Sequence, residues 1–156
     1  MFGFFEKKEA RIDEAKAPAY VEWKGWRTFK VMNRKHECAD TTTFTLMPAD
    51  GQPLPAFRAG QGVALRLEGF EPRAYTLCST PDEGCYRITI KVLDNDRGAL
   101  SARIAQSLFV GDKIEVSEPA GGFVLDDRDT SVVMIAEGIG ITPMVAMLSE
   151  IATDHP

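Results

Sequence analysis

The sequence is poor in the residue types that build metal centres and disulfide frameworks. Its 156 residues include only three cysteines and two histidines. Cys38, Cys78 and Cys85 show neither a CxxC spacing nor any other spacing typical of zinc or iron–sulfur sites. An odd number of scattered cysteines is typical of reduced thiols in an intracellular protein. We therefore expect no metal site and a cytoplasmic location.

The sequence also lacks long apolar runs and an excess of positive charge. No run approaches the roughly 20 apolar residues that are needed to cross a bilayer, and the apolar cluster after Met1 is too short for a secretory leader. The net charge of −5 gives no electrostatic reason to expect a nucleic acid or an anionic membrane as partner. With 44% hydrophobic and 26% charged residues, the composition is that of a globular domain with a core.

Alternating apolar and polar residues predict six short strands. The expected strands cover residues 27–33, 41–47, 62–68, 73–79, 86–93 and 113–117. Turns rich in glycine, proline and aspartate separate them. A helix is expected over 99–108, where Leu100, Ile104 and Leu108 repeat every four residues. Six short strands with one helix indicate a small antiparallel barrel over residues 26–125.

The pattern changes after the polar residues 126–130. An uninterrupted apolar run, Val132–Ala136, is typical of a strand buried on both faces. A glycine turn follows, and then a helix is expected over residues 143–152. This order indicates the first β-α unit of a parallel α/β domain over residues 130–156. Residues 1–25 form a charged N-terminal lead-in.

One β-α unit cannot cover both faces of its own strand. We therefore expect that most of the second domain is absent from this chain. An uncovered apolar strand favours association, so homodimer formation or poor solubility is expected.

The most informative segment is Arg73-Ala-Tyr-Thr-Leu-Cys-Ser79. Side chains two apart in a strand point the same way, so Arg73 and Tyr75 share a face and Thr76 lies on the other. A guanidinium binds phosphate oxygens bidentately, and a tyrosine ring can stack on a flat ligand. This combination suits a nucleotide cofactor, of which a flavin is the simplest candidate. For this segment alone, an ordinary edge strand with a solvated arginine is the alternative.

Two glycine-containing segments lie where a helix is expected to begin. Gly98-Ala-Leu-Ser101 opens the first predicted helix, and a helix N-terminus can hold a phosphate. Simple helix capping is the alternative. Glu137-Gly-Ile-Gly-Ile-Thr-Pro143 precedes the second helix, and its glycines allow backbone to approach a diphosphate while Thr142 can cap. A tight turn without a ligand is the alternative there.

Six segments of the chain together carry a family resemblance. They are Phe57-Arg-Ala-Gly-Gln61, Arg73-Ala-Tyr-Thr-Leu-Cys-Ser79, Ile88-Thr-Ile-Lys91, Gly98-Ala-Leu-Ser101, Pro119-Ala-Gly-Gly-Phe123 and Gly138-Ile-Gly-Ile-Thr-Pro143. Taken in this order, they resemble the ferredoxin–NADP reductase-like flavoproteins, most closely the reductase portion of flavohaemoglobins and of multicomponent oxygenase reductases. The resemblance covers about residues 26–152. It implies a mainly β fold, a six-stranded antiparallel Greek-key flavin-binding barrel with one helix, followed by the first β-α unit of an α/β NAD(P)-binding domain.

The resemblance implies FAD as the prosthetic group and NAD(P)H as the co-substrate. Arg73 would pair with the flavin diphosphate, and Tyr75 would lie against the isoalloxazine. Thr76 would be the catalytic residue, with its hydroxyl near flavin N5. Thr142 would contact the nicotinamide nucleotide. The remaining residues expected to bind the cofactor are Ser79, Ile90, Lys91, Gly98, Ala99, Leu100 and Ser101. The residues by themselves do not distinguish FAD from FMN.

The implied activity is electron transfer from NAD(P)H through the flavin to a haem or iron–sulfur acceptor, on a partner protein or domain.

Two departures from the family pattern affect the expected NAD(P)H site. Glu137 stands where the family usually has glycine, and its charge would oppose a phosphate. The segments that bind the adenosine half of NAD(P)H are absent, so that site is expected to be incomplete, and the sequence does not distinguish NADH from NADPH.

Two alternatives stay open. The chain can be an FAD-binding module, or a gene fragment, that has no NAD(P)H turnover of its own and needs a partner chain. It can also be a regulatory domain that kept the fold and lost the ligand, although barrel packing does not require Arg73, Tyr75, Thr76 and Ser101 together.

Overall fold

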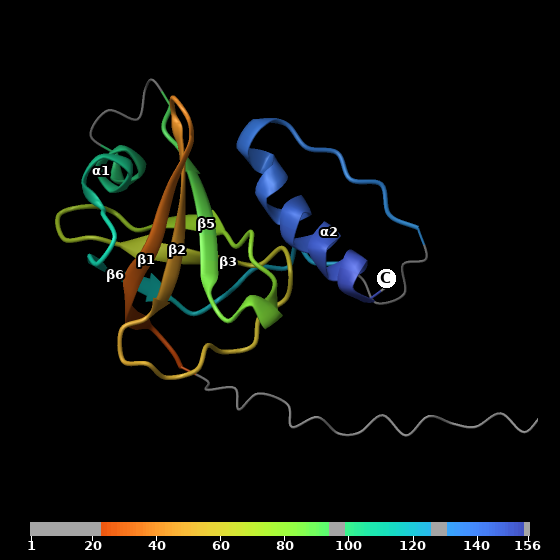
Figure 1. The fold of residues 1–156 in the computed structure, drawn as a ribbon, viewed down its shortest axis with the longest axis horizontal. Coiled ribbons are helices and arrows are strands. Elements are labelled where there is room, and N and C mark those ends of the chain that lie inside the picture. The colour runs from red at the N-terminus through yellow and green to blue at the C-terminus, as the bar shows by residue number, and fades with distance from the viewer. Residues whose placement is uncertain (1–22, 94–98, 126–130, 155–156) are drawn as a thin grey trace, which may run out of the picture.

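The computed structural model describes residues 23–93, 99–125 and 131–154. Six antiparallel strands in these ranges form one sheet in the order β4-β3-β6-β1-β2-β5 (Figure 1). All six predicted strands are confirmed, with shifted ends. The strands are β1 (Trp26–Cys38), β2 (Thr41–Pro48), β3 (Gly62–Arg66), β4 (Arg73–Thr76), β5 (Tyr86–Lys91) and β6 (Lys113–Ser117).

The two outer strands of the sheet, β4 and β5, meet just beyond the end of β4. Leu77 forms an antiparallel bridge with Ile88, and the Cys78 N–H donates to the Arg87 carbonyl at 2.8 Å. These contacts close the sheet into a barrel, and β6 lies between β1 and β3 in a Greek-key order. The expected mainly β Greek-key barrel is therefore confirmed.

Alternating apolar residues explain why these segments pair as they do. Phe29 and Val31 of β1 and Phe44 and Leu46 of β2 are fully buried, whereas their neighbours along each strand are more exposed. The predicted first strand ends at residue 33, but β1 continues to Cys38 because residues 34–38 keep pairing with β2. That extension is polar on both faces, so hydrophobic alternation could not reveal it.

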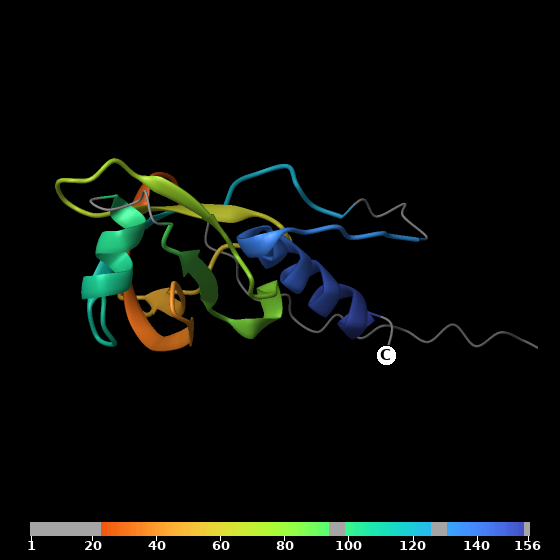
Figure 2. The ribbon, with the colours of Figure 1, turned by 90° about the horizontal axis from the view of Figure 1, so that it is seen from above.

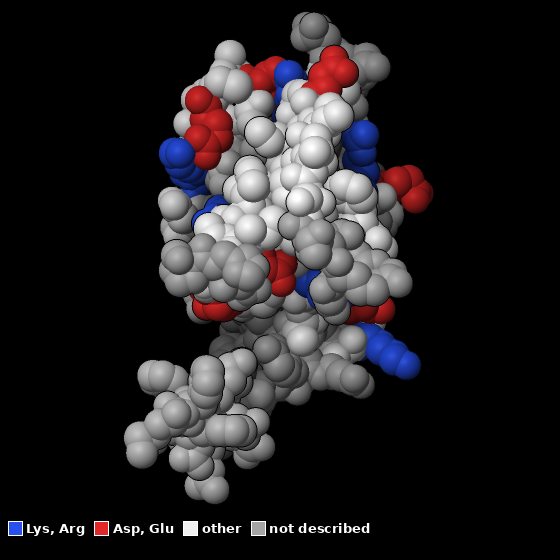
Figure 3. Space-filling view, turned by 90° about the vertical axis from the view of Figure 1, so that its right-hand side faces the viewer, with Lys and Arg blue, Asp and Glu red and all other residues white. Residues whose placement is uncertain are grey.

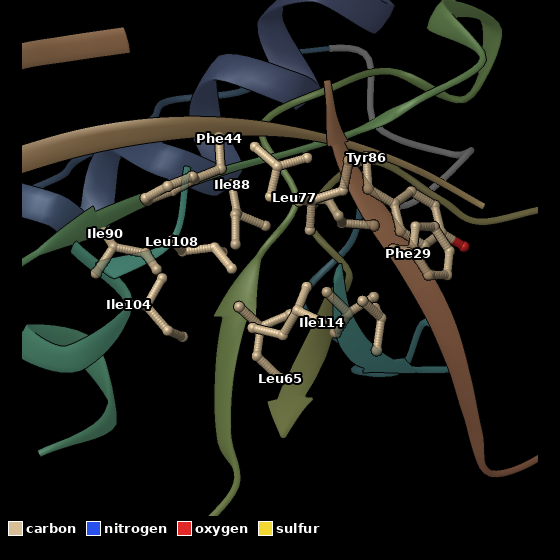
Figure 4. Packing of buried hydrophobic residues seen from close by; sticks show 14 of the residues in the cluster. Phe29, Phe44, Leu65, Leu77, Tyr86, Ile88, Ile90, Ile104, Leu108 and Ile114 are labelled. Carbon is tan, nitrogen blue, oxygen red and sulfur yellow. The ribbon is translucent and has the colours of Figure 1, made fainter. Parts of the chain in front are cut away.

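The barrel interior is filled by large aliphatic and aromatic side chains (Figure 4). Tyr86 stacks on Phe29, with ring centroids 5.2 Å apart, and Phe57 meets the Tyr86 ring edge-on at 5.5 Å. Fully burying an aliphatic or phenylalanine side chain contributes about 1.5–3 kcal/mol. This core holds the strands that carry the candidate site.

The hydroxyl of Tyr86 is buried and finds no hydrogen-bond partner among the described residues. Burial raises the pKa of this hydroxyl above its ordinary value of 10.0, although nearby Arg27 acts in the opposite direction. Tyr86→Phe removes a buried polar group that lacks compensation, and it should stabilise the fold by about 1 kcal/mol at neutral pH. Chemical denaturation measures this change.

The same substitution should also change how stability depends on pH. Above pH 10 the unfolded chain releases the Tyr86 proton while the folded chain keeps it. The stability of the unaltered protein therefore falls with rising pH, relative to Tyr86→Phe, by about 1.4 kcal/mol per pH unit. A constant difference between the two proteins from pH 8 to pH 11 would contradict this account.

Two α-helices lie on opposite sides of the barrel (Figure 2). Helix α1 (Leu100–Ser107) buries Leu100 and Ile104 against the barrel core. Helix α2 (Thr142–Asp154) packs Ala146 and Met147 against Ala59. The short 3-10 helices are η1 (Pro81–Glu83) and η2 (Gly138–Ile141). Both predicted helices are confirmed, and none in the described ranges is long and apolar enough to cross a membrane.

The expected buried strand at residues 132–136 is not formed. This segment pairs with no strand in the described part of the chain, and Val133 and Ile135 are 87% and 85% exposed. A parallel strand gains its ladder hydrogen bonds from neighbouring strands, and the six-stranded sheet does not reach this segment. Met134, between the two exposed residues, packs toward the Ala146–Met147 cluster.

This exposed segment and α2 lie on the side of the molecule that Figure 3 displays, where uncharged side chains occupy the centre and charged ones lie mainly toward the edges. Homodimer formation through this face stays a prediction. Residues 1–22 of the expected lead-in (residues 1–25) lie outside the described residues, as do residues 94–98 and the polar residues 126–130, so the domain boundaries also stay predictions.

Candidate functional site

Three of the predicted residues meet at the start of α1. The Tyr75 hydroxyl lies 2.9 Å from Ser101 Oγ, and the Arg73 guanidinium donates to the same Oγ at 3.2 Å. Arg73 and Tyr75 come from β4, and Ser101 lies 28 and 26 residues further along the chain. The fold thus brings together two segments that lie apart in the sequence. We call this group the Arg73–Tyr75–Ser101 cluster.

The register of β4 explains why Arg73 and Tyr75 point together. Arg73 pairs with Leu65 and Tyr75 with Val63, and both partners belong to the barrel core. Directly paired residues share a face of the sheet, so Arg73 and Tyr75 lie on the core side near the end of the barrel. The Tyr75 ring packs against the core while its hydroxyl reaches Ser101. Their expected shared face is confirmed.

The N-terminus of α1 adds backbone donors to the cluster. Ser101, which is only 4% exposed, is the second residue of this eight-residue helix. The N-cap residue Ala99 provides no side-chain cap, and the first turn of any helix has N–H groups without helical partners. A guanidinium, two hydroxyls and a helix N-terminus form a donor set that fits a phosphate or diphosphate.

Simple helix capping, the alternative to a phosphate site at Gly98-Ala-Leu-Ser101, does not describe Ser101, because its hydroxyl is bonded to Tyr75 and Arg73. Ala99 is half-buried and Leu100 is 2% exposed, so Leu100 can reach a ligand only through its backbone. Gly98 lies outside the described residues.

Thr76 occupies the opposite face of β4, as expected. It is half-buried and pairs with Gly62 of β3. A Cβ atom added to Gly62 would lie 2.7 Å from the Tyr75 carbonyl oxygen, which is closer than ordinary packing permits. Glycine at position 62 therefore allows β3 to approach β4 closely where Thr76 and Tyr75 are held.

A cavity of about 640 Å³ lies between the outer face of the barrel and the start of α2. The barrel side is polar and includes Thr43, Thr89 and Lys91, whereas the opposite wall includes the apolar Ile139 and Ile141. Thr142 also lines this cavity, and its hydroxyl donates to the Ile139 carbonyl at 3.1 Å. The Thr142 hydroxyl therefore does not cap the helix as expected. It bonds to Ile139, which also lines the cavity.

Charges of both signs line the cavity. Hydrogen bonds from Thr41 and Cys38 hold the pKa of the Asp40 carboxyl below its ordinary value, and the nearby Lys91 acts in the same direction. Lys91 Nζ lies 3.4 Å from Asp40. Hydrogen bonds from Lys35 and Thr43 likewise lower the pKa of Glu37. Both carboxylates are thus ionised at neutral pH, so the cavity combines fixed charge with an apolar wall.

The structure does not bring every predicted residue to one place. Lys91 and Thr142 line the cavity, whereas the three members of the Arg73–Tyr75–Ser101 cluster do not. Ile90 is 1% exposed and belongs to the core, so only its backbone can border a ligand. Ser79 is fully buried, and its Oγ accepts the Arg87 N–H at 3.1 Å. Its side chain therefore lies in the connection between β4 and β5.

Other residues were not identified from the sequence. Gly60 has a φ of +98°, and a Cβ there would overlap the Phe123 carbonyl oxygen. Gly60 lies in the segment Phe57-Arg-Ala-Gly-Gln61 that contributes to the family resemblance, but no role was assigned to it there. Arg87 donates to Glu83 and to the Cys78 carbonyl, and it forms part of the cavity wall. Glu137 is exposed. Within the described ranges, no three His, Cys, Asp or Glu residues are grouped to hold a metal ion.

Comparisons with known proteins agree with this architecture. No family model matches the chain. A flavohemoprotein from Pseudomonas aeruginosa is 40% identical over 145 residues, which cover 91% of this chain and 36% of the relative. The chain thus spans about a third of the length of the curated relatives it matches.

Two solved structures also share the fold. The flavohem-like FAD/NAD binding domain of nitric oxide dioxygenase from Vibrio cholerae O1 biovar El Tor has a TM-score of 0.77 and 34% identity, covering 82% of this chain and 57% of that one. Phthalate dioxygenase reductase has a TM-score of 0.79 and 32% identity, covering 84% and 41%. In both sequence and fold, the chain therefore matches the ferredoxin–NADP reductase-like flavoproteins and the reductase portion of the flavohaemoproteins.

Proposed function

We propose that the chain is the FAD-binding part of a flavin-dependent NAD(P)H oxidoreductase. The observation that carries this proposal is the Arg73–Tyr75–Ser101 cluster, in which a cation, a phenol and a hydroxyl meet at a helix N-terminus. The choice of FAD is supported by the Vibrio cholerae structure, which is an FAD/NAD binding domain.

The cluster fits the phosphate end of this cofactor. Arg73, Ser101 and the first N–H groups of α1 would bind the diphosphate, because all are hydrogen-bond donors around one point. Tyr75 would contact the isoalloxazine, and Thr76 on the other face of β4 would donate a hydrogen bond to N5. When bound, the flavin supplies the redox chemistry, since it accepts a hydride and returns electrons singly.

The cavity beside α2 fits the co-substrate. Thr142 and the apolar Ile139 on one wall would hold a flat ring that carries a polar group, and Lys91 on the opposite wall would border the flavin. The acceptor would be a haem or an iron–sulfur centre, as the similarity to flavohemoproteins and to a reductase that delivers electrons to [2Fe-2S] supports.

We also propose a cytoplasmic location, an FAD-binding barrel at residues 26–125, and the start of an NAD(P)-binding domain at 130–156.

A second candidate is an FAD-binding module that requires another chain for turnover with NAD(P)H. The exposure of Val133 and Ile135 favours it, because these side chains are suited to burial beneath further structure. Anaerobic mixing of the FAD-loaded protein with NADH or NADPH decides between the two candidates. Rapid bleaching of the yellow colour supports the autonomous reductase. A flavin that dithionite bleaches but neither nucleotide bleaches supports the module.

A further inference from the structure

The side chain of Arg34 in β1 forms a hydrogen bond with helix α1. Its guanidinium donates to the Ala105 carbonyl at 2.7 Å, from a position 71 residues earlier in the chain. It also lies over the rings of Phe109 and Phe44, 5.2 and 6.0 Å from their centroids. Its Nε atom is buried and has no hydrogen-bond partner in the described part of the chain. These contacts fix the guanidinium between strand and helix.

The position of α1 depends on such contacts. A helix of eight residues is too short to be stable without tertiary packing. Ala105 lies in its last turn, where a cation also stabilises the negative end of the helix dipole. Ser101 lies four residues before Ala105, about 6 Å along the helix axis. The contact with Arg34 thus holds the helix one turn away from the Arg73–Tyr75–Ser101 cluster.

We propose that Arg34 is a positioning residue for the FAD site. It holds α1 so that Ser101 and the first N–H groups of the helix face Arg73, and it does not touch the ligand. This inference rests on the proposed function, because it assigns the diphosphate to the start of α1. It predicts that loss of Arg34 weakens binding of the diphosphate part of FAD and spares the ring.

Three variants and two ligands test whether Arg34 positions α1 for binding the diphosphate. Arg34→Met keeps a long side chain and removes the charge and the donor, whereas Arg34→Lys keeps the charge and one donor. Arg103→Met is the matched control, because Arg103 is an exposed arginine on the same helix. FAD and riboflavin, which lacks the diphosphate, are titrated into each protein. Arg34→Met should weaken FAD binding about tenfold and riboflavin binding less than about twofold, as for other positioning contacts.

Arg34→Lys should recover most of the FAD affinity, and Arg103→Met should retain all of it. Equal weakening of FAD and riboflavin by Arg34→Met, or no weakening of either, overturns the inference. Amide hydrogen exchange without ligand is a second readout: Arg34→Met should speed exchange in α1 but not at Ile88 of β5. If the unaltered chain binds no FAD, the proposed function fails, and unchanged exchange in α1 would show separately that Arg34 does not hold the helix.

Discussion

Arg73→Ala is expected to weaken FAD binding by about 1–3 kcal/mol, which is roughly 5- to 150-fold. Arg73 is the charged member of the Arg73–Tyr75–Ser101 cluster, and its loss removes charge-assisted hydrogen bonds to the diphosphate. The remaining binding should depend less on salt, because one cation that attracts the phosphates is gone. Titration of FAD at low and high ionic strength measures both effects.

Arg66→Ala is the matched control. Arg66 lies on the neighbouring strand β3, where it pairs with Glu115 and stacks over Trp26 at 4.4 Å. It is an arginine of the same sheet that is bonded elsewhere, so its removal should leave FAD affinity unchanged. If Arg73→Ala and Arg66→Ala bind FAD equally well, the assignment of Arg73 to the diphosphate is wrong.

Gly60→Ala is expected to have the largest effect on stability, a loss of about 3 kcal/mol or more. Gly60 has a φ of +98°, which L side chains rarely adopt, and its added Cβ would overlap the Phe123 carbonyl oxygen and lie 2.5 Å from Met147 Cε. The end of the Met147 side chain can move aside, but relieving the overlap with Phe123 requires movement of the backbone. Denaturation with urea measures the loss.

Gly51→Ala separates backbone strain from crowding. Gly51 also has a positive φ, +69°, but an added Cβ would meet nothing within 4 Å. Its substitution should therefore cost only about 1 kcal/mol for the backbone conformation. Equal losses for the two variants would show that crowding at Gly60 contributes nothing.

The barrel could be predicted from the sequence because its strands obey local rules. Phe44 and Leu46 alternate with polar residues, as do Tyr86, Ile88 and Ile90, and each of these side chains is buried as expected. The strand expected at 132–136 was wrong because an apolar run predicts burial without specifying what provides it. Val133 and Ile135 have the composition of a buried strand, yet the sheet offers them no neighbour.

The site was predicted in part, and the differences have physical reasons. Alternation placed Arg73 and Tyr75 on one face of β4, and the pairing of β3 with β4 agrees. Helix-capping rules suggested a cap at Ser101, but they do not include a tyrosine hydroxyl from a distant strand. The roles of Arg34 and Gly60 could not be predicted, because they depend on residues that are distant in the sequence, namely Ala105, Phe123 and Met147.

Equilibrium dialysis against FAD is the sharpest test of the proposed cofactor. We expect the purified chain to take up about one FAD per chain at micromolar concentration, and the complex to be yellow. Uptake of riboflavin should be weaker, because the donors of Arg73 and Ser101 would then have no diphosphate to bind. If the folded chain takes up no FAD under these conditions, FAD is not its cofactor.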